Sequence, residues 1–266
     1  MLSKLLKYEI EATGRIFLPL FLSLLVFAGI NKFISAIDPQ KMNTPANISM
    51  AIYIIIMAGI FVMTFTMMIQ RFYKNLLTDE GYLMHTLPVK PWKHIVSKLL
   101  VSMLWMLSSV IVAMISILII AYKKGDITEI FNGLVTVHTR VIEQLGAWAY
   151  LLTFEIILGV LLCLAAGILI IYASIAIGHL FNRHKMLASF GAFITLNVLT
   201  QIFLKLASLI QEITHFPNIH IASNDFLGSL SAIHLLICYA IIIIGLLCAA
   251  YFAATNYILS KRLNLE

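Results

Sequence analysis

The chain has 266 residues, of which 61% are hydrophobic and 11% are charged, and its formal net charge is +6. A soluble domain of this length carries about 25% charged residues, so the composition excludes an ordinary soluble protein and predicts an integral membrane protein. The basic residues are spread between apolar runs and form no single basic face, so we do not expect nucleic acid as a partner.

The N-terminal segment, residues 1–15, is amphipathic. Leu2, Leu5, Leu6 and Ile10 recur near helical spacing, whereas charged residues occupy the other faces. This pattern predicts an interfacial helix that leads into the first membrane span. Acidic residues interrupt its basic region and no convincing cleavage site follows, so we do not expect a cleaved signal peptide.

Six apolar runs are about as long as the roughly 20 residues that cross a hydrocarbon core. These runs cover residues 16–37, 50–69, 99–122, 147–172, 186–204 and 230–259. The sequence therefore predicts an all-α integral membrane protein, with one transmembrane domain (1–266) that contains six helices. Two of the connections, 123–146 and 210–228, are long enough to hold short helices.

The basic residues predict the orientation of these spans. If the N-terminus is cytoplasmic, twelve of the 18 lysine and arginine residues lie in inner segments and six lie in outer segments. Inner segments are usually the more basic ones, so we expect both termini on the cytoplasmic side.

Residues 71–98, between the second and third predicted spans, read RFYKNLLTDEGYLMHTLPVKPWKHIVSK. Their five basic and two acidic residues keep this segment out of the hydrocarbon. Phe72 with Leu76, and Tyr73 with Leu77, repeat at i,i+4, which predicts a water-facing apolar stripe on a short helix. We expect a partner to cover this stripe, either another protein or the lipid surface.

The motifs of common catalytic and cofactor sites are missing from the sequence. It contains no GxxxxGK[ST], GxGxxG, HExxH or GxSxG, and no paired cysteines of a zinc site. The three cysteines lie in apolar runs, so a disulfide framework is not expected either. The sequence therefore predicts a protein that is not an enzyme and has no catalytic, cofactor-binding or metal-binding residues.

Glu155 is the one carboxylate inside a predicted span. A charged group there costs roughly 2.5–3.5 kcal/mol on insertion scales, so it should be neutral, paired or in contact with water. It either hydrogen-bonds a neighbouring helix or is wet near the interface, or it lies on a possible translocation path. A proton relay is disfavoured, because no other acid lies well inside a span.

Four stretches of the chain resemble the six-span permease subunits of bacterial ATP-binding-cassette exporters of the ABC-2 type, in their Firmicutes form. The strongest match is RFYKNLLTDEGYLMHTLPV with the SKLL that follows, within residues 71–100. IYASIAIGHLFNRHK (171–185), the KRLNLE ending (261–266) and the N-terminal KYEIEATGR (7–15) are also similar to that family. The resemblance covers essentially the whole chain.

The resemblance implies a transport subunit without an ATPase site of its own. ATP and Mg²⁺ would be bound by a separate cytoplasmic ATPase subunit, present in two copies, and a second permease chain would complete a homodimer or heterodimer. In that family, the segment between the second and third spans is the coupling element that docks on the ATPase. Carried over, the ATPase-coupling residues of this chain are Phe72, Tyr73, Lys74, Leu76, Leu77, Asp79, Glu80, Tyr82 and Leu83.

The resemblance further implies export of amphipathic peptides or hydrophobic compounds across the bacterial plasma membrane, with membrane lipids as further partners. Two other classes remain open. One is a secondary carrier that uses no ATPase, and the other is a structural or immunity-type membrane protein whose amphipathic segment lies on lipid. Copurification with an ATPase subunit would separate the exporter from both.

Overall fold

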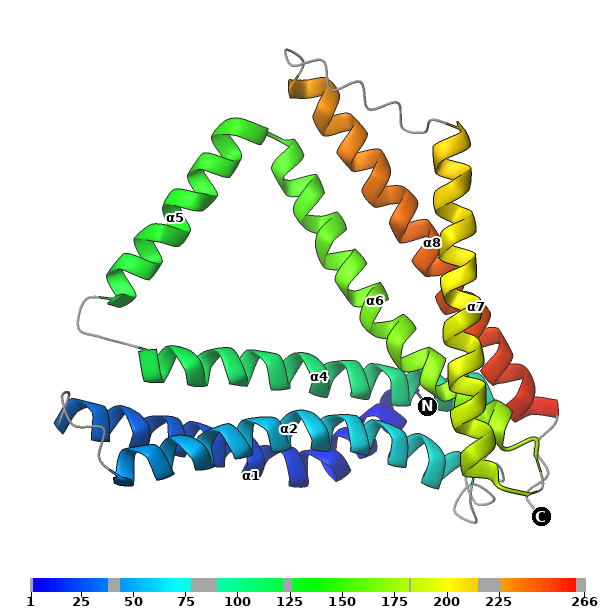
Figure 1. Cartoon of the computed structure of the whole chain (residues 1–266), viewed down its shortest axis with the longest axis horizontal. Coiled ribbons are helices and arrows are strands. Elements are labelled where there is room, and N and C mark those ends of the chain that lie inside the picture. Colours follow the sequence, from blue (N-terminus) through cyan, green and yellow to red (C-terminus); the bar gives the residue numbers. More distant parts are fainter. Residues whose placement is uncertain are drawn as a thin grey trace. The chain divides into compact units, whose positions relative to one another are not determined.

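The computed structural model describes residues 2–37, 44–77, 90–121, 126–181, 183–214 and 226–261, and all regular structure in these residues is α-helical. This finding confirms the predicted all-α class for the described part of the chain. The helices, shown in Figure 1, are α1 (Leu2–Ile37), α2 (Thr44–Leu77), α4 (Pro91–Ala121), α5 (Asp126–Leu145), α6 (Trp148–Gly178), α7 (Lys185–Thr214) and α8 (Phe226–Lys261).

Six of these helices, all except α5, are long and apolar enough to cross a membrane. The prediction of six spans is therefore confirmed. α6 has 31 residues, which corresponds to about 46 Å of helix and exceeds the roughly 30 Å of a hydrocarbon core. The helices thus continue past the apolar runs, because a helix needs no hydrocarbon around its ends.

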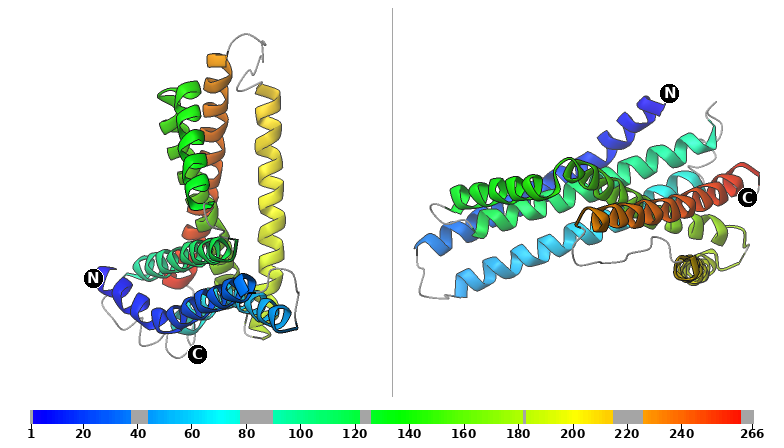
Figure 2. Two further views of the ribbon diagram at one scale, coloured as in Figure 1. Left: turned by 90° about the vertical axis from the view of Figure 1, so that its left-hand side faces the viewer. Right: turned by 90° about the horizontal axis from the view of Figure 1, so that it is seen from above.

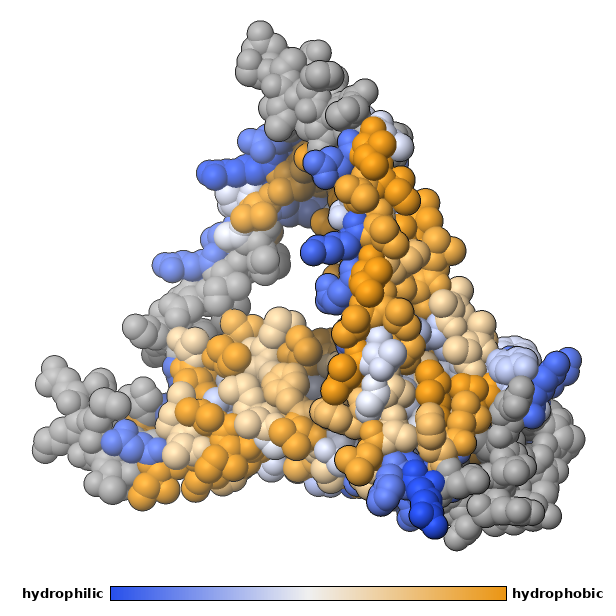
Figure 3. Space-filling view, turned by 45° about the vertical axis from the view of Figure 1, so that its right-hand side comes forward, coloured by the Kyte–Doolittle hydropathy of each residue, from blue (hydrophilic) through white to orange (hydrophobic). Residues whose placement is uncertain are grey.

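Large apolar side chains lie exposed along the described helices, as expected for residues that face lipid. Phe154 on α6 is 65% exposed and Leu187 on α7 is 70% exposed. Figure 3 shows hydrophobic residues following the helices along their length. Soluble monomers rarely expose apolar surface of this extent, so these exposed faces and the six apolar helices together describe a multi-pass membrane protein.

Two helices include segments that the sequence patterns predict to be separate helices. The predicted interfacial segment, residues 1–15, is not a separate helix, because α1 runs from Leu2 through the first span and includes Pro19. Residues 71–77 likewise form the last turns of α2. No glycine or proline separates the span from the apolar stripe there, so nothing local ends the helix between them.

The two long connections also acquire helical structure. α5 occupies most of the first connection, residues 123–146, for which the sequence indicated only that a short helix would fit. In the second connection, α7 continues to Thr214, ten residues beyond the predicted end of its span. Residues 215–225 lie outside the described part of the chain.

The chain divides into two compact units, and the first contains α1, α2 and α4. Its core is built on the indole of Trp105, which stacks on the ring of Phe17 with centroids 4.6 Å apart and planes inclined by 14°. Hydroxyl pairs join α2 to α4: Thr64 lies 3.0 Å from Ser109, and Tyr53 lies 2.9 Å from Ser116. Side-chain hydrogen bonds of this kind hold helices together where no hydrophobic driving force acts between them.

The second unit contains α6, α7 and α8, and α5 is divided between the units after residue 134. α6 packs against both α7 and α8. Figure 2 gives two further views of the helices. Gly178, at the end of α6, lies so close to α7 that a Cβ atom there would be 2.5 Å from the Cα and N atoms of Ser189. Only glycine fits this approach. The hydroxyl of Tyr239 on α8 donates to the carbonyl of Ala207 on α7 at 2.8 Å.

Candidate functional site

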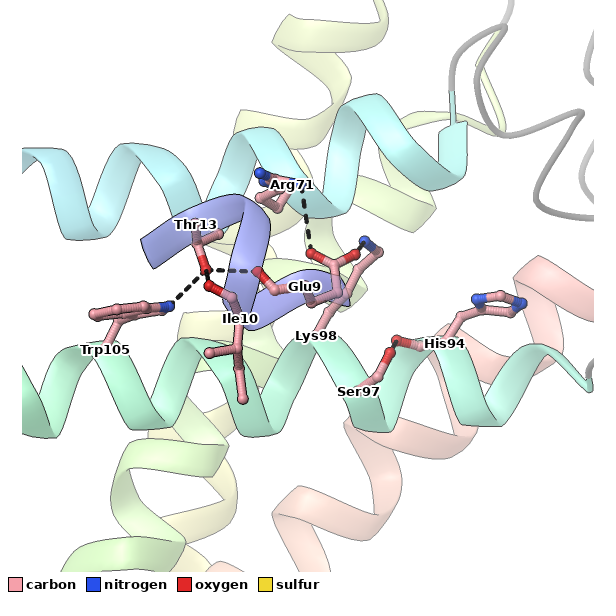
Figure 4. A network of polar contacts seen from close by, with 8 residues as sticks. All are labelled: Glu9, Ile10, Thr13, Arg71, His94, Ser97, Lys98 and Trp105. Atoms are coloured by element: carbon pink, nitrogen blue, oxygen red, sulfur yellow. Dashed lines mark hydrogen bonds and ion pairs between the residues drawn. The ribbon is translucent and has the colours of Figure 1, made fainter. Parts of the chain in front are cut away.

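Glu9, near the start of α1, binds one cationic side chain with each of its two carboxylate oxygens (Figure 4). Lys98 Nζ on α4 lies 2.6 Å from Oε1, and Arg71 Nη1 on α2 lies 3.6 Å from Oε2. All three helices belong to the first unit. One carboxylate therefore joins α1, α2 and α4.

This group of charges is largely shielded from solvent. The side chain of Lys98 is 3% exposed and that of Glu9 is 11% exposed, whereas Arg71 keeps 26% of its surface accessible. Removing one partner of a buried ion pair costs about 3–5 kcal/mol, because the remaining charge loses its compensation. Removing either Glu9 or Lys98 should therefore cost more stability than removing one partner of an exposed ion pair.

A chain of hydrogen bonds links Glu9 to the aromatic core of the first unit. Trp105 Nε1 donates to Thr13 Oγ1 at 2.7 Å, and that hydroxyl donates to the Glu9 carbonyl oxygen at 2.6 Å. A small cavity of about 20 Å³ lies among these residues. Its volume suits a single water molecule. Through these two hydrogen bonds, the indole of Trp105 fixes the turn of α1 that carries Glu9.

The partners of Glu9 are the two end residues of segment 71–98. Arg71 opens that segment near the end of α2, and Lys98 closes it two turns into α4. Glu9 therefore links both end residues of this segment to α1.

The predicted coupling residues differ in accessibility. Phe72 and Leu76 are fully buried, so the prediction that both face water is wrong. Helical spacing shows only that two residues share a face, and not whether the chain itself covers that face. Tyr73 is half-buried and Lys74 is exposed, so both remain accessible to a partner.

The other predicted coupling residues are less fully described. Leu77 ends α2, but its side chain is outside the described part of the structure. Asp79, Glu80, Tyr82 and Leu83 lie outside the described residues altogether. Their assignment to a coupling element stays a prediction.

Glu155, in the second unit, contacts α8. Its Oε1 pairs with His234 Nδ1, and the thiol of Cys238 donates to the same oxygen at 3.6 Å. Glu155 is 6% exposed, and its Oε2 is buried without a hydrogen-bond partner among the described residues. The structure thus gives Glu155 the helix–helix contact that was the first of its two interpretations.

An apolar groove of about 430 Å³ runs from Glu155 between α6 and α8. Its lining residues come from both helices and are Glu155, Ile156, Gly159, Val160, Cys163, Leu164, Ile237, Ala240, Ile241 and Ile244. The carboxylate is the single acidic group of this lining. The groove could hold an apolar chain with one polar end near Glu155.

Five residues of these two sites were not singled out from the sequence: Glu9, Arg71, Lys98, His234 and Cys238. His234 and Cys238 are four residues apart and therefore share one face of α8, which was a usable local signal. Glu9 and Lys98 are 89 residues apart in the chain. No local pattern relates them.

His179, directly after α6, is outside the spans and is half-buried. Burial lowers the pKa of its imidazole below the ordinary value, and the nearby positive charge of Lys185 lowers this pKa further. The neutral ring is therefore favoured where the chain turns from α6 towards α7.

In comparisons with family models, with curated proteins and with solved structures, none matches this chain.

Proposed function

We propose that the chain is the permease subunit of a bacterial exporter of the ABC-2 type, which moves cargo outward on ATP hydrolysis by a separate subunit. The observation that carries the proposal is the attachment of both ends of segment 71–98 to Glu9. A coupling element must pass a movement to the spans, and this segment is fastened to three of them. Rigid-body movement of packed helices is a common means of switching access.

The proposal includes partners that the chain itself requires. The sequence has no phosphate-binding loop, so ATP and Mg²⁺ are assigned to two copies of a cytoplasmic ATPase subunit. A second permease chain completes the path. The chain lies in the bacterial plasma membrane with both termini on the cytoplasmic side, next to the ATPase.

We assign amphipathic peptides or hydrophobic compounds as the cargo. The groove along α6 and α8 is lined by aliphatic side chains and has one carboxylate at its end. Such a surface suits an apolar chain that carries a polar or cationic group. Glu155 is the proposed contact of that group on the translocation path.

The first test concerns docking of the ATPase. Replacing Tyr73 and Leu77 together with Ala should remove two interface anchors, at about 1–2 kcal/mol each. The tagged chain is purified in mild detergent from the cells that make it, and vanadate-sensitive ATP hydrolysis retained per mole of chain is measured. We expect at least about tenfold less retained activity in the variant, since 1.4 kcal/mol is a factor of ten in affinity.

Tyr150→Ala is the matched control, because Tyr150 is 64% exposed at the start of α6. This substitution should leave the retained ATP hydrolysis unchanged. Charge reversal at Asp79 and Glu80 to Lys should also release the ATPase, since repulsion adds to lost complementarity. If the segment lay on anionic lipid instead, the added positive charge would strengthen its membrane contact. Unchanged hydrolysis in both variants would contradict the assignment of this segment.

The second test concerns orientation. In a background without native cysteines, a single cysteine at Asn132 should react with an impermeant thiol reagent added to intact cells. Asn132 lies on α5, and its side chain is exposed. Cysteines at Asn75 and Asn182 should react only after the cells are opened. Labelling of the Asn75 position from outside would reverse the proposed topology.

A secondary carrier is the second candidate, and the Glu155–His234 pair favours it. The pair places two titratable groups in contact inside the spans, and proton-coupled carriers use such groups. Transport into vesicles separates the two candidates. Cargo movement that requires ATP and survives a proton ionophore supports the exporter, whereas movement that follows the proton gradient without ATP supports the carrier.

A further inference from the structure

The contact between α6 and α8 brings three different metal-binding side chains together. The carboxylate of Glu155, the imidazole of His234 and the thiol of Cys238 each offer one ligand atom, and these atoms lie within 4.8 Å of one another. We infer that they form a binding site for one Zn²⁺ ion, which would bridge the two helices. This site does not depend on the proposed transport function.

The spacing of the ligand atoms is close to that of a zinc site. Bond lengths of about 2.3 Å to sulfur and about 2.0–2.1 Å to nitrogen or oxygen place tetrahedral ligands about 3.3–3.6 Å apart. The Cys238 sulfur lies 3.6 Å from Glu155 Oε1 and 3.8 Å from His234 Nδ1. Only the contact between Glu155 Oε1 and His234 Nδ1 is closer, and these two atoms must move apart when an ion binds between them.

Glu155 supplies an independent sign of a missing ligand. Only 6% of the surface of this residue is exposed. Its second oxygen, Oε2, has no hydrogen-bond partner among the described residues. An unsatisfied buried acceptor costs about 1–3 kcal/mol. A carboxylate that binds the ion through one or both oxygens removes this cost.

The charges of the ligands also match a divalent cation. A carboxylate and a thiolate contribute two negative charges, and a neutral imidazole contributes none. Together with Zn²⁺ the site is electrically neutral, which is the favourable state for a group of ions inside a membrane-spanning helix pair. A thiolate ligand means that ion binding would displace the thiol proton of Cys238.

The mixture of ligand atoms selects the metal. One oxygen, one nitrogen and one sulfur suit Zn²⁺ and its spectroscopic substitute Co²⁺. Mg²⁺ and Ca²⁺ prefer oxygen ligands alone, and Cu⁺ prefers thiolates and thioethers. With three protein ligands, a fourth position is left for Oε2 or for a water molecule.

The site lies close enough to one end of its helices for an ion to enter. Glu155 is the eighth residue of α6 and His234 is the ninth of α8, so both lie about 10–12 Å from the helix start. If α6 is centred in the bilayer, about 8 Å of it projects beyond the core at each end. The His234 side chain is 27% exposed and forms the entrance, with the Trp148 ring edge-on against it at 5.7 Å between centroids.

The test uses the full-length chain in lipid nanodiscs, purified with a tag that contains no histidine. Metal-free protein is titrated with Co²⁺, and bound Zn²⁺ is measured by elemental analysis after equilibrium dialysis. We expect one ion per chain and a Co²⁺ spectrum with thiolate-to-metal charge-transfer bands. Zn²⁺ should abolish these bands, whereas Mg²⁺ should leave them unchanged.

Variants of each ligand then locate the ion. Cys238→Ser should abolish the charge-transfer bands, and Glu155→Gln and His234→Ala should each weaken Zn²⁺ binding by at least about tenfold, the lower end of the loss seen even for outer-shell groups. Cys163→Ser and Cys248→Ser are matched controls from the same unit and should change neither quantity. Size-exclusion profiles of the metal-free variants show whether each remains folded.

Three results would overturn the inference. They are a Co²⁺ spectrum without thiolate bands, charge-transfer bands that persist in Cys238→Ser, and a bound-ion content that none of the three ligand variants reduces. If Glu155→Gln fails to fold without metal, Cys238→Ser still decides the question, because serine keeps the size of the side chain and removes only the sulfur.

Discussion

Replacing Glu9 with Gln should lower the free energy of unfolding by about 3–5 kcal/mol, the usual cost of breaking a buried ion pair. The substitution keeps the shape of the side chain and removes its charge. Lys98, which is 3% exposed, then loses the carboxylate that balances its ammonium group at 2.6 Å. Unfolding of the purified chain in mixed micelles of increasing denaturing-detergent content measures the change.

Glu11→Gln is the matched control, two residues further along α1. Glu11 pairs with Lys7 at 3.8 Å, but both side chains are more than half exposed. Exposed pairs contribute little to stability, so this variant should unfold like the unchanged chain. Equal stability of the Glu9 and Glu11 variants would show that the buried pair contributes no more to the free energy of unfolding than the exposed pair does.

A second substitution separates lost charge balance from lost packing. Lys98→Met in the Glu9→Gln background removes the buried charge and keeps an unbranched side chain of similar length. Replacing both members of a buried pair with uncharged groups is often neutral. We therefore expect the double variant to recover most of the stability that Glu9→Gln loses. If the double variant recovers stability but loses coupled ATP hydrolysis, the ion pair serves transport as well as stability.

Replacing Gly178 with Val should disrupt the contact between α6 and α7. The added Cβ would lie 2.5 Å from two backbone atoms of Ser189. A flexible side chain could move away from such a contact, but a backbone cannot, so the helices must separate. Overpacking costs typically about 1–3 kcal/mol, and a clash with backbone belongs at the upper end of that range. Thermal unfolding of the detergent-solubilised chain checks this expectation.

Gly167 provides the comparison within the same helix. No atom lies within 4 Å of the position that its Cβ would occupy. Gly167→Ala should therefore stabilise α6 slightly, by up to about 1 kcal/mol, because alanine favours the helix. Gly178→Ala should destabilise it. If the two alanine variants shift the unfolding temperature in the same direction, the close approach at Gly178 is not the controlling feature.

The part of the fold that could be predicted is the part set by nearest neighbours in sequence. A run of about 20 apolar residues predicts a span wherever it occurs, and each of the six predicted runs overlaps a long helix. The ends of the helices were less accurate, because no glycine or proline ends α2 at the edge of the hydrocarbon and α1 continues through both Gly14 and Pro19.

The candidate sites could be predicted only in part. Glu155 was identified because a carboxylate in an apolar run is costly whatever surrounds it. Its partner His234 comes from another helix, and their pairing depends on how α6 and α8 pack. Phe72 and Leu76 share a helical face, as predicted, but their burial contradicts the expected contact with water.

The sequence by itself determined the membrane class, the six apolar helices and the presence of an isolated acid within a span, since hydropathy and helical periodicity are properties of adjacent residues. Only the tertiary structure decided that Glu9 holds Arg71 and Lys98, that Glu155 meets His234 and Cys238, and that Gly178 touches α7. Glu9 and Lys98 are separated by 89 residues, and side chains so far apart in the chain become neighbours only when their helices pack.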